Sequence, residues 1–305
     1  MSALHKKFPG VEVGGSSSMK SSNIGGQAVM EGVMMRNADK YAVAVRKTDG
    51  EIVVKTEEYK GIVQNKKIRS LPIIRGVFSF IDSMVLGMST LTYSASFFMD
   101  EEEEEKDEKK ESVMMGLTIA CSVVMAVAIF MILPYFLSQL FRKFTDSTTL
   151  ITLLEGAVRL VIFFGYILLI SRMKDIQRVF MYHGAEHKCI NCIEHGMELN
   201  VENVLKSSRL HKRCGTSFLF IVMIVSIIFF LFIRIESPIW RVVFRLLLIP
   251  VIAGVSYELI RLAGRSDNGF VNLISKPGLM LQGLTTREPD DAMIEVGIAS
   301  VEAIF

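Results

Sequence analysis

Cysteine and net charge are both scarce in this sequence. Four cysteines among 305 residues, three of them close together, are too few and too clustered for a disulfide framework. This usage favours a metal site or a reduced compartment. A formal net charge of +2 gives no reason to expect a nucleic-acid partner. Residues 1–20 contain no apolar run, so we expect no cleavable signal peptide.

Apolar residues are abundant instead. Half of the chain is hydrophobic and the mean hydropathy is +0.40, which is too apolar for an ordinary soluble protein. At about 1.5 Å per residue, a segment of about 20 residues crosses a hydrocarbon core of about 30 Å. Four segments are long enough: 113–135, 150–171, 216–235 and 240–260. We therefore predict a mainly α, polytopic α-helical membrane protein with about four spans.

The first hundred residues carry weaker signals. Residues 1–26 have little apolar periodicity and predict a flexible start. Tyr41–Val45 and Ile52–Lys55 flank the turn Thr48-Asp49-Gly50, which predicts a small cytosolic β-hairpin. Residues 71–99 have apolar positions at helical spacing but also contain charges. They predict an amphipathic helix at the membrane surface or against the bundle, with a fifth span as the alternative.

The distribution of basic residues predicts how the chain is oriented across the membrane. The segment 172–215 carries eight lysines and arginines, whereas the loop between the first two spans carries only Arg142 and Lys143. Because basic loops stay inside, we expect both termini and this segment to be cytoplasmic. The chain then divides into a cytosolic N-terminal segment with the hairpin (1–70), the amphipathic or membrane-surface helix (71–99), an acidic linker (100–112), spans one and two (113–171), a cytosolic His/Cys loop (172–215), spans three and four (216–260) and a cytosolic C-terminal tail (261–305).

The His/Cys loop carries the clearest chemistry. Four of the five histidines and three of the four cysteines lie between His183 and Cys214. If residues 172–188 continue the second span as a helix, His183 and His187 share one face, one turn apart, which suits a shared metal ion. Glu186 lies beside His187, and His-x-x-Glu-His is the order of inverted zinc-protease motifs. We therefore expect Zn²⁺ or another divalent transition metal, with Glu186 as the catalytic base.

Further ligands must come from elsewhere in the chain. His211 and Cys214 precede the third span and would return to the membrane surface near the first pair of histidines. A His₂Cys set with water would be an open, catalytic type of site, and a His₃Cys set would be a closed, structural one. Cys189-x-x-Cys192 and His195 are further candidates, although cysteines in a helical segment are more often inert.

Two charged pairs fall within the apolar segments. Glu155 and Arg159 are four residues apart, and Glu258 and Arg261 are one turn apart. Charges inside a membrane are costly, and they mark either structural ion pairs or a polar site. We favour structural pairs over a polar path, so a transporter or channel is the weakest functional hypothesis.

Four stretches together resemble the YqhQ family of bacterial membrane proteins, described as predicted metal-dependent enzymes of unknown function. These stretches are Gly25–Arg36, His183–Lys188, His211–Phe218 and the C-terminal run Pro277–Gln282 with Thr285–Asp291. The resemblance covers the chain from about Gly25 to its end. It implies the bacterial cytoplasmic membrane, and it favours His183, Glu186, His187, His211 and Cys214 over Cys189, Cys192 and His195.

The leading hypothesis is a membrane-integral, cytoplasm-facing zinc hydrolase that acts on an unidentified lipid or peptide at the bilayer surface. Arg36 or Arg213 would steady developing negative charge. The alternative is a metal-stabilised scaffold or biogenesis factor without catalysis, with membrane-protein partners or as a homo-oligomer. In that case four protein ligands would close the metal site.

Overall fold

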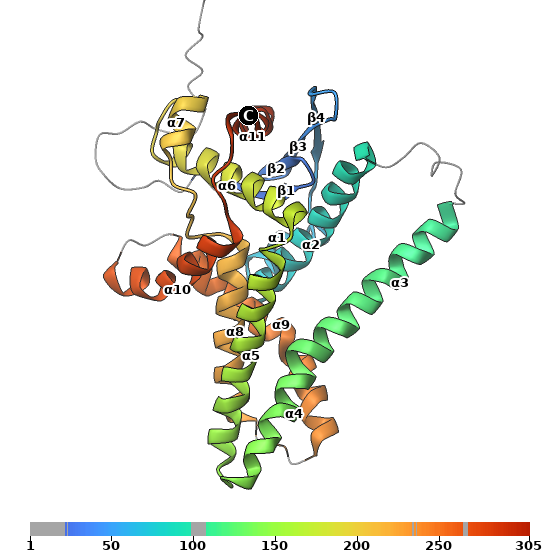
Figure 1. The fold of residues 1–305 in the computed structure, drawn as a ribbon, viewed down its shortest axis with the longest axis vertical. Coiled ribbons are helices and arrows are strands. Elements are labelled where there is room, and N and C mark those ends of the chain that lie inside the picture. The colour runs from blue at the N-terminus through green and yellow to red at the C-terminus, as the bar shows by residue number, and fades with distance from the viewer. Residues whose placement is uncertain (1–21, 23, 99–107, 234, 236, 265–267) are drawn as a thin grey trace, which may run out of the picture.

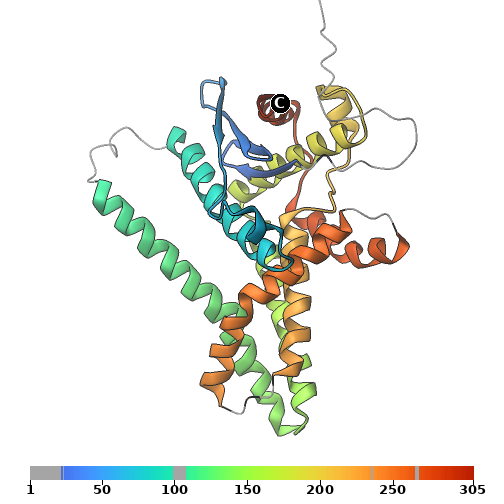
Figure 2. The same cartoon turned by 180° about the vertical axis from the view of Figure 1, so that it is seen from behind.

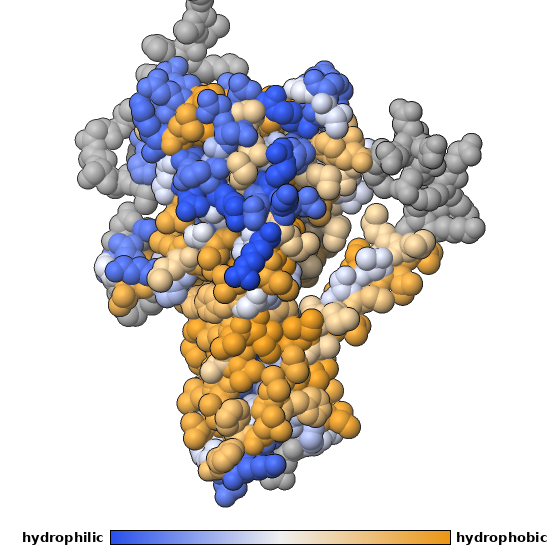
Figure 3. All heavy atoms as spheres, viewed as in Figure 1, coloured by the Kyte–Doolittle hydropathy of each residue, from blue (hydrophilic) through white to orange (hydrophobic). Residues whose placement is uncertain are grey.

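The structure is a computed structural model that describes residues 22, 24–98, 108–233, 235, 237–264 and 268–305. The predicted flexible start and the first part of the acidic linker fall on residues 1–21, 23 and 99–107, outside the described residues. Helices dominate what is described, and they form two parts, which we call the bundle and the head (Figure 1). The surface of the bundle is mostly apolar and that of the head mostly polar (Figure 3).

The bundle contains the four segments predicted as spans. They correspond to α3 (Glu108–Val127) with the π-helical turn η3 (Ala128–Ile132) and α4 (Leu133–Gln139), then α5 (Thr148–Ile170), α8 (Gly215–Phe232) and α9 (Pro238–Ala263). Ser147 caps α5 by accepting a hydrogen bond from the backbone of Leu150. With Ile74–Phe98, five helical stretches of the described chain are long and apolar enough to cross a membrane. Their contact with a bilayer and the number of spans stay predictions.

The head is built on a four-stranded antiparallel sheet, larger than the predicted hairpin. The hairpin is confirmed as β3 (Lys40–Arg46) with β4 (Ile52–Glu58), and β2 (Gly32–Asn37) and β1 (Gly25–Val29) continue the sheet in sequence order. Gly26 shows why glycine is needed in the edge strand. A Cβ there would lie 2.7 Å from Cγ of Glu186, so only glycine lets the strand approach that side chain.

Alternate residues of the sheet face two different helical layers. Val33, Met35 and Ala42 pack against α6 (Lys174–Glu194) and α11 (Asp291–Ala303). Met34 and Val43 face the other way, in a cluster with Leu86 of α2 (Ile74–Ala95). The sheet is therefore covered on both faces, which fits the alternation of side chains along a strand. Figures 1 and 2 show these layers from opposite sides.

The two ends of α2 contact different parts of the molecule. Near its start, Gly76 lies so close to α9 that a Cβ would be 2.9 Å from the carbonyl of Gly254, and Arg75 donates to Glu258 at 2.6 Å. Farther along, Thr90 and Ser94 are buried, and Ser94 accepts a hydrogen bond from Met30. The packing of α2 on the sheet agrees with a helix held against the protein and does not test whether it crosses a membrane.

Smaller elements complete the head, its junction with the bundle and, in the case of η4, the far end of the bundle between α4 and α5. They are α1 (Lys66–Ser70), the 3₁₀ turns η1 (Ser96–Phe98) and η4 (Leu140–Lys143), α7 (Val201–Lys206) and α10 (Gly269–Thr285). α10 lies crosswise at the end of α8, where the apolar and polar surfaces meet (Figures 1 and 3). The last described residues and the sheet both lie in the head, at one end of the bundle. The side of a membrane that this end faces stays a prediction.

Candidate metal centre

The chain breaks between α5 and α6, contrary to the prediction that a single helix continues from the second span. Ser171 ends α5, and Met173 before α6 has an extended backbone. The break redirects α6 beneath the sheet, where its middle is buried from Tyr182 to Ile193 with His183 only partly exposed. His183 and His187 still lie on one helix, one turn apart. The predicted shared face for the two imidazoles is therefore present despite the break.

The structure brings His183, His187 and Cys214 together. One potential ligand atom from each lies within 4.8 Å of the other two, and His183 Nε2 is 3.2 Å from Cys214 Sγ. In a tetrahedral zinc site, neighbouring ligand atoms are about 3.3–3.6 Å apart, given bond lengths of about 2.0–2.3 Å. The His183–Cys214 distance already approaches that value. The largest separation between two of these ligand atoms, at most 4.8 Å, would shorten to such a distance with shifts of about an ångström.

Both imidazoles are fixed through Nδ1, which leaves Nε2 for a metal. His183 Nδ1 donates to the carbonyl of Thr285 at 2.9 Å, and His187 Nδ1 donates to the carbonyl of Arg209 at 2.6 Å. Such backbone partners orient metal-binding histidines and set their tautomer. His187 Nε2 is buried and has no hydrogen-bond partner in the described structure. Burial lowers the pKa of His187, although the neighbouring Cys214 side chain works against this shift, and the lowered pKa favours the neutral imidazole that a metal requires.

Cys214 is the N-cap of α8. Its sulfur accepts from the backbone N–H of Thr216 at 3.4 Å and lies 2.9 Å from the hydroxyl of that residue. The N-terminus of a helix stabilises negative charge, and the thiolate is the form of cysteine that binds metals. Two imidazoles and one cysteine sulfur make up a donor set of the kind found in open zinc sites.

The segment Ser207–Cys214, which we call the ligand loop, is held to the head by its backbone. Lys188 donates to the carbonyls of Leu205 and Ser207 at 2.8 and 2.9 Å, and Asn191 donates to those of Ser208 and Leu210 at 2.6 and 3.0 Å. Each of these buried side chains thus meets two carbonyls that would otherwise be desolvated without a partner. These four hydrogen bonds hold the loop, together with Leu205, against α6.

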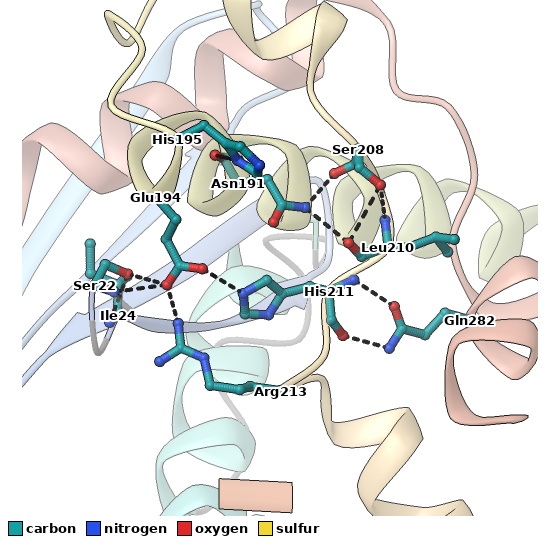
Figure 4. A network of polar contacts seen from close by, with 10 residues as sticks. All are labelled: Ser22, Ile24, Asn191, Glu194, His195, Ser208, Leu210, His211, Arg213 and Gln282. Carbon is teal, nitrogen blue, oxygen red and sulfur yellow. Dashed lines mark hydrogen bonds and ion pairs between the residues drawn. The ribbon is translucent and has the colours of Figure 1, made fainter. Parts of the chain in front are cut away.

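Gln282 of α10 fixes the ligand loop from its other side. Its side-chain oxygen accepts from the backbone of His211 at 2.9 Å, and its nitrogen donates to the carbonyl of His211 and to Ser217, both at 2.7 Å. Gln282 is fully buried. Figure 4 shows this paired contact beside the polar network of the loop.

His211 belongs to that network and not to the three-residue cluster. Its Nε2 lies 3.2 Å from Glu194, which also accepts from Arg213 and from Ser22 (Figure 4). Burial alone would raise the pKa of Glu194, but the hydrogen bond from His211 and the charge of Arg213 bring it to about 2. The His211 ring is 5.8 Å from that of His187, centroid to centroid. It is close to the centre while its nitrogen is directed at Glu194.

Glu186 lies on the side of α6 that faces the sheet. At about 100° per residue, it is about 60° from His183 around the helix. Its side chain packs against Gly26, and its carboxylate makes no hydrogen bond or ion pair with the described residues. Burial raises the pKa of Glu186 to about 7, although the neighbouring His183 works against this shift. It is thus a buried, unpartnered carboxylate next to the cluster.

The other candidates lie elsewhere. Cys189 and Cys192 are buried in the apolar core of the head, and burial raises the pKa of both thiols, to about 11 for Cys192. Both cysteines therefore stay protonated at neutral pH. His195 is exposed at the end of α6 and contacts the carbonyl of Asn191. Arg36 donates to the carbonyl of Ala38 in the β2–β3 turn and to that of Tyr59 just after β4.

Sequence reasoning missed the residues that hold the ligands in place. The Thr285 carbonyl is near His183 because the chain around Arg287 crosses α6 at Gly184, where a Cβ would lie 2.0 Å from the Arg287 carbonyl. The C-terminal motif that includes Gln282 and Thr285 was noticed, but no local pattern assigns it to this centre. Its polar residues within an otherwise apolar helix were the one available signal.

Comparison with known proteins identifies the family of this chain. Residues 71–305 match the family model "Protein of unknown function (DUF1385)". The chain belongs to this DUF1385 family. It is also 37% identical over 292 residues to "Uncharacterized protein YqhQ" of Bacillus subtilis (strain 168), with 92% of each chain covered. The resemblance to the YqhQ family is therefore confirmed. No solved structure matches the chain.

The family assignment places every member of the cluster inside the matched region. His183, His187 and Cys214 all lie within residues 71–305, as do Gln282 and Thr285 that hold them. The DUF1385 description names no reaction and no metal, so the chemistry must be argued from the geometry.

Proposed function

We propose that this DUF1385 protein is a zinc-dependent hydrolase whose active site lies where the bundle meets the head. The observation that carries the proposal is the buried Nε2 of His187, which has no partner and lies beside the donor atoms of His183 and Cys214. An unpaired buried polar atom costs about 1–3 kcal/mol. A bound metal ion would supply the missing partner for this atom.

The proposed roles follow from the donor set. His183, His187 and Cys214 would hold the ion, and three protein ligands leave a fourth position for water or substrate. There the metal would act as a Lewis acid that lowers the pKa of a bound water. Glu186 is proposed as the base because it is buried, unpartnered and adjacent to His187 in the chain.

Arg213 is proposed to act on the ligand loop and not on the reacting charge. Its guanidinium is engaged with Glu194, and Arg36 is engaged at the β2–β3 hairpin. The sequence predicts that one of these two arginines steadies developing negative charge. Their contacts favour structural roles, which leaves the metal itself to stabilise charge in the proposed reaction.

A closed structural site is the second candidate function. The 5.8 Å separation between the rings of His187 and His211 favours it, because a turn of His211 away from Glu194 could provide a fourth ligand. Against it, Lys188, Asn191 and Gln282 already hold the ligand loop. A metal clamp would therefore add little order.

The apolar helices support a location in the bacterial cytoplasmic membrane. Five helical stretches are candidates for spans, and the segment 172–215 carries the basic residues that favour the cytoplasmic side. The active site would then face the cytoplasm, where Cys214 stays reduced. The substrate would come from the membrane surface or from a peptide near it.

Metal analysis of the purified full-length protein tests the first step. Wild type should carry about one zinc per chain, and His187→Ala and Cys214→Ser should each lose most of it. His211→Ala should keep the metal if the site is open and weaken it if the site is closed. A wild-type protein that takes up no transition metal, even after incubation with zinc, would refute the proposal.

The cobalt-loaded protein then separates binding from chemistry. Cobalt(II) should give a sulfur-to-metal charge-transfer band that Cys214→Ser removes. Glu186→Gln should keep metal and band while abolishing the function that a deletion strain lacks. If Glu186→Gln restores that function as well as wild type does, Glu186 is not the base and a structural metal is favoured.

A further inference from the structure

A cavity of about 520 Å³ lies beside the residues that support the candidate metal centre, at the junction of bundle and head. Ser171 at the end of α5, Met181 of α6 and Leu284 at the end of α10 form part of its wall. Arg209, Thr286 and Arg287 complete the side toward the ligand loop. The cavity has the size of a site for a small organic ligand.

The cavity has an excess of positive charge. Arg209 and Arg287 line it, and the one carboxylate in its wall, Glu288, already contacts Lys188 at 3.0 Å and Arg209 at 3.3 Å. The two arginines of the wall thus outnumber its one carboxylate, and Lys188 adds a third cation through its contact with Glu288. Because the two contacts neutralise Glu288, the wall favours an anionic ligand.

Each of the two arginines uses only some of its N–H groups in hydrogen bonds with the described residues. Arg287 donates from Nη2 to the carbonyl of Ser171 at 3.1 Å, and Arg209 donates from Nη1 to the carbonyl of Thr286 at 2.5 Å. Within the described chain, Nε and Nη1 of Arg287 and Nη2 of Arg209 carry no hydrogen bond. These bonds hold the guanidinium groups in place while other donors remain available, and guanidinium geometry suits phosphate oxygens.

The apolar part of the wall and its position indicate where the anion comes from. Met181 and Leu284 provide an apolar side, and Ser171 ends a helix that is long and apolar enough to cross a membrane. Nearby on α10, Leu273 and Met280 expose apolar side chains, and the molecular surface changes from apolar to polar at this height (Figure 3). Basic pockets at the cytoplasmic ends of membrane helices bind anionic lipid headgroups.

We propose that this cavity binds the phosphate-bearing headgroup of an anionic phospholipid. The segment that lines it also holds the metal ligands, because the carbonyls of Arg209 and Thr285 orient His187 and His183. A bound headgroup would therefore share supporting residues with the candidate centre. That the lipid is also the substrate rests on the proposed hydrolase function, but its binding does not.

Gly283 provides a direct test, because it lines the cavity and an added Cβ would meet no atom within 4 Å. Gly283→Phe should therefore fold while its ring occupies the cavity, and replacing glycine in a helix favours the helix. Gly165→Phe is the matched control, since Gly165 of α5 is exposed and equally open. Arg287→Gln removes charge and donors without adding bulk.

Binding is measured by native mass spectrometry of the full-length protein in detergent, with short-chain phosphatidylglycerol, short-chain phosphatidylcholine and inorganic phosphate as probes. Wild type and Gly165→Phe should bind phosphatidylglycerol at least about tenfold more tightly than phosphatidylcholine. Gly283→Phe and Arg287→Gln should lose that preference. Unchanged phosphatidylglycerol binding by Gly283→Phe would overturn the proposal.

Two further arms separate the alternatives. If inorganic phosphate binds as tightly as phosphatidylglycerol, the cavity is a site for a free anion and the lipid assignment is wrong. Zinc content, measured on the same samples, should be equal in wild type and Gly283→Phe. A protein that binds phosphatidylglycerol at this cavity but no zinc would keep this inference and lose the proposed function.

Discussion

Two buried polar clusters in this protein each contain a pair of side chains four residues apart in the sequence. They differ in how completely their polar atoms are paired. In the bundle, both oxygens of Glu155 are used: Arg159 contacts one at 2.9 Å, and Arg245 contacts both at 2.5 and 2.8 Å. In the candidate metal centre, His187 Nε2 has no partner. Both clusters are buried and polar, so neither burial nor polarity by itself marks a functional site. The unmet ligand atom among converging donors is what separates them.

The bundle cluster also has unmet atoms, but of another kind. Nε of Arg159 and Nε of Arg245 lack hydrogen-bond partners. Each belongs to a guanidinium that is bonded through its other nitrogens, and both groups lie over the ring of Phe230, at 4.9 and 4.6 Å. Cation–π contacts of this kind offset part of the excess positive charge. The cluster thus fits the predicted structural ion pair, with Arg245 as an added partner.

The largest effect is expected from removing the shared carboxylate. Glu155→Leu leaves two buried arginines without an anion and should lower the free energy of unfolding by about 3–5 kcal/mol. Denaturation of the detergent-solubilised protein would measure it, with zinc per folded chain as the second readout. Zinc per folded chain should not change. A variant that folds normally but loses zinc would mean that the two clusters act together.

Gly184→Ala should have the next largest effect, because it alters the support of the metal centre. The added Cβ would lie 2.0 Å from the backbone carbonyl of Arg287, which cannot move without shifting Thr285 away from His183. Overpacking of this kind costs about 1–3 kcal/mol, and zinc affinity should fall. Gly165→Ala, in open space, is the control. Equal zinc affinity in both variants would show that the Thr285 carbonyl does not position His183.

Local patterns predicted part of this molecule correctly. The four bundle helices follow from long apolar runs, and β3 and β4 follow from alternation around Thr48-Asp49-Gly50. Glu155 and Arg159 are paired because they are four residues apart on one helix. In each case the partners are neighbours in the chain, where spacing alone determines proximity.

What depended on distant packing could not be predicted. The edge strand β1 begins with two glycines, which disfavour a strand, and it forms by pairing with β2 along its whole length while Gly26 packs against Glu186. Arg245 reaches Glu155 from 90 residues away. His183, His187 and Cys214 were proposed as ligands, and the structure brings them together. That they bind metal stays a prediction.

A smaller effect is expected at Gln282, which holds the ligand loop without touching the three candidate ligands. Gln282→Leu keeps the volume but leaves the backbone N–H of His211 without a partner, and the His211 carbonyl keeps only the contact from the N–H of Cys214 at 3.4 Å. The cost should be about 1–3 kcal/mol. If the loop positions Cys214, zinc should also bind more weakly. Gln139→Leu, at the far end of the bundle, is the matched control. Unchanged zinc affinity in Gln282→Leu would mean that the N-cap geometry of α8 positions Cys214 and that the ligand loop does not.

The smallest effect is expected at His195, which has the same side chain as His187 in a different setting. It is exposed, and its Nδ1 lies 2.7 Å from the carbonyl of Asn191 in its own helix. His195→Ala should therefore change stability by no more than about 0.5 kcal/mol and leave the zinc content unchanged, whereas His187→Ala should lose the metal. Because both histidines lie on α6, the pair of variants isolates the effect of setting from that of residue type. Loss of zinc from His195→Ala would extend the metal centre to the end of α6. An unpartnered buried nitrogen would then no longer be the feature that distinguishes a ligand from an ordinary histidine in this protein.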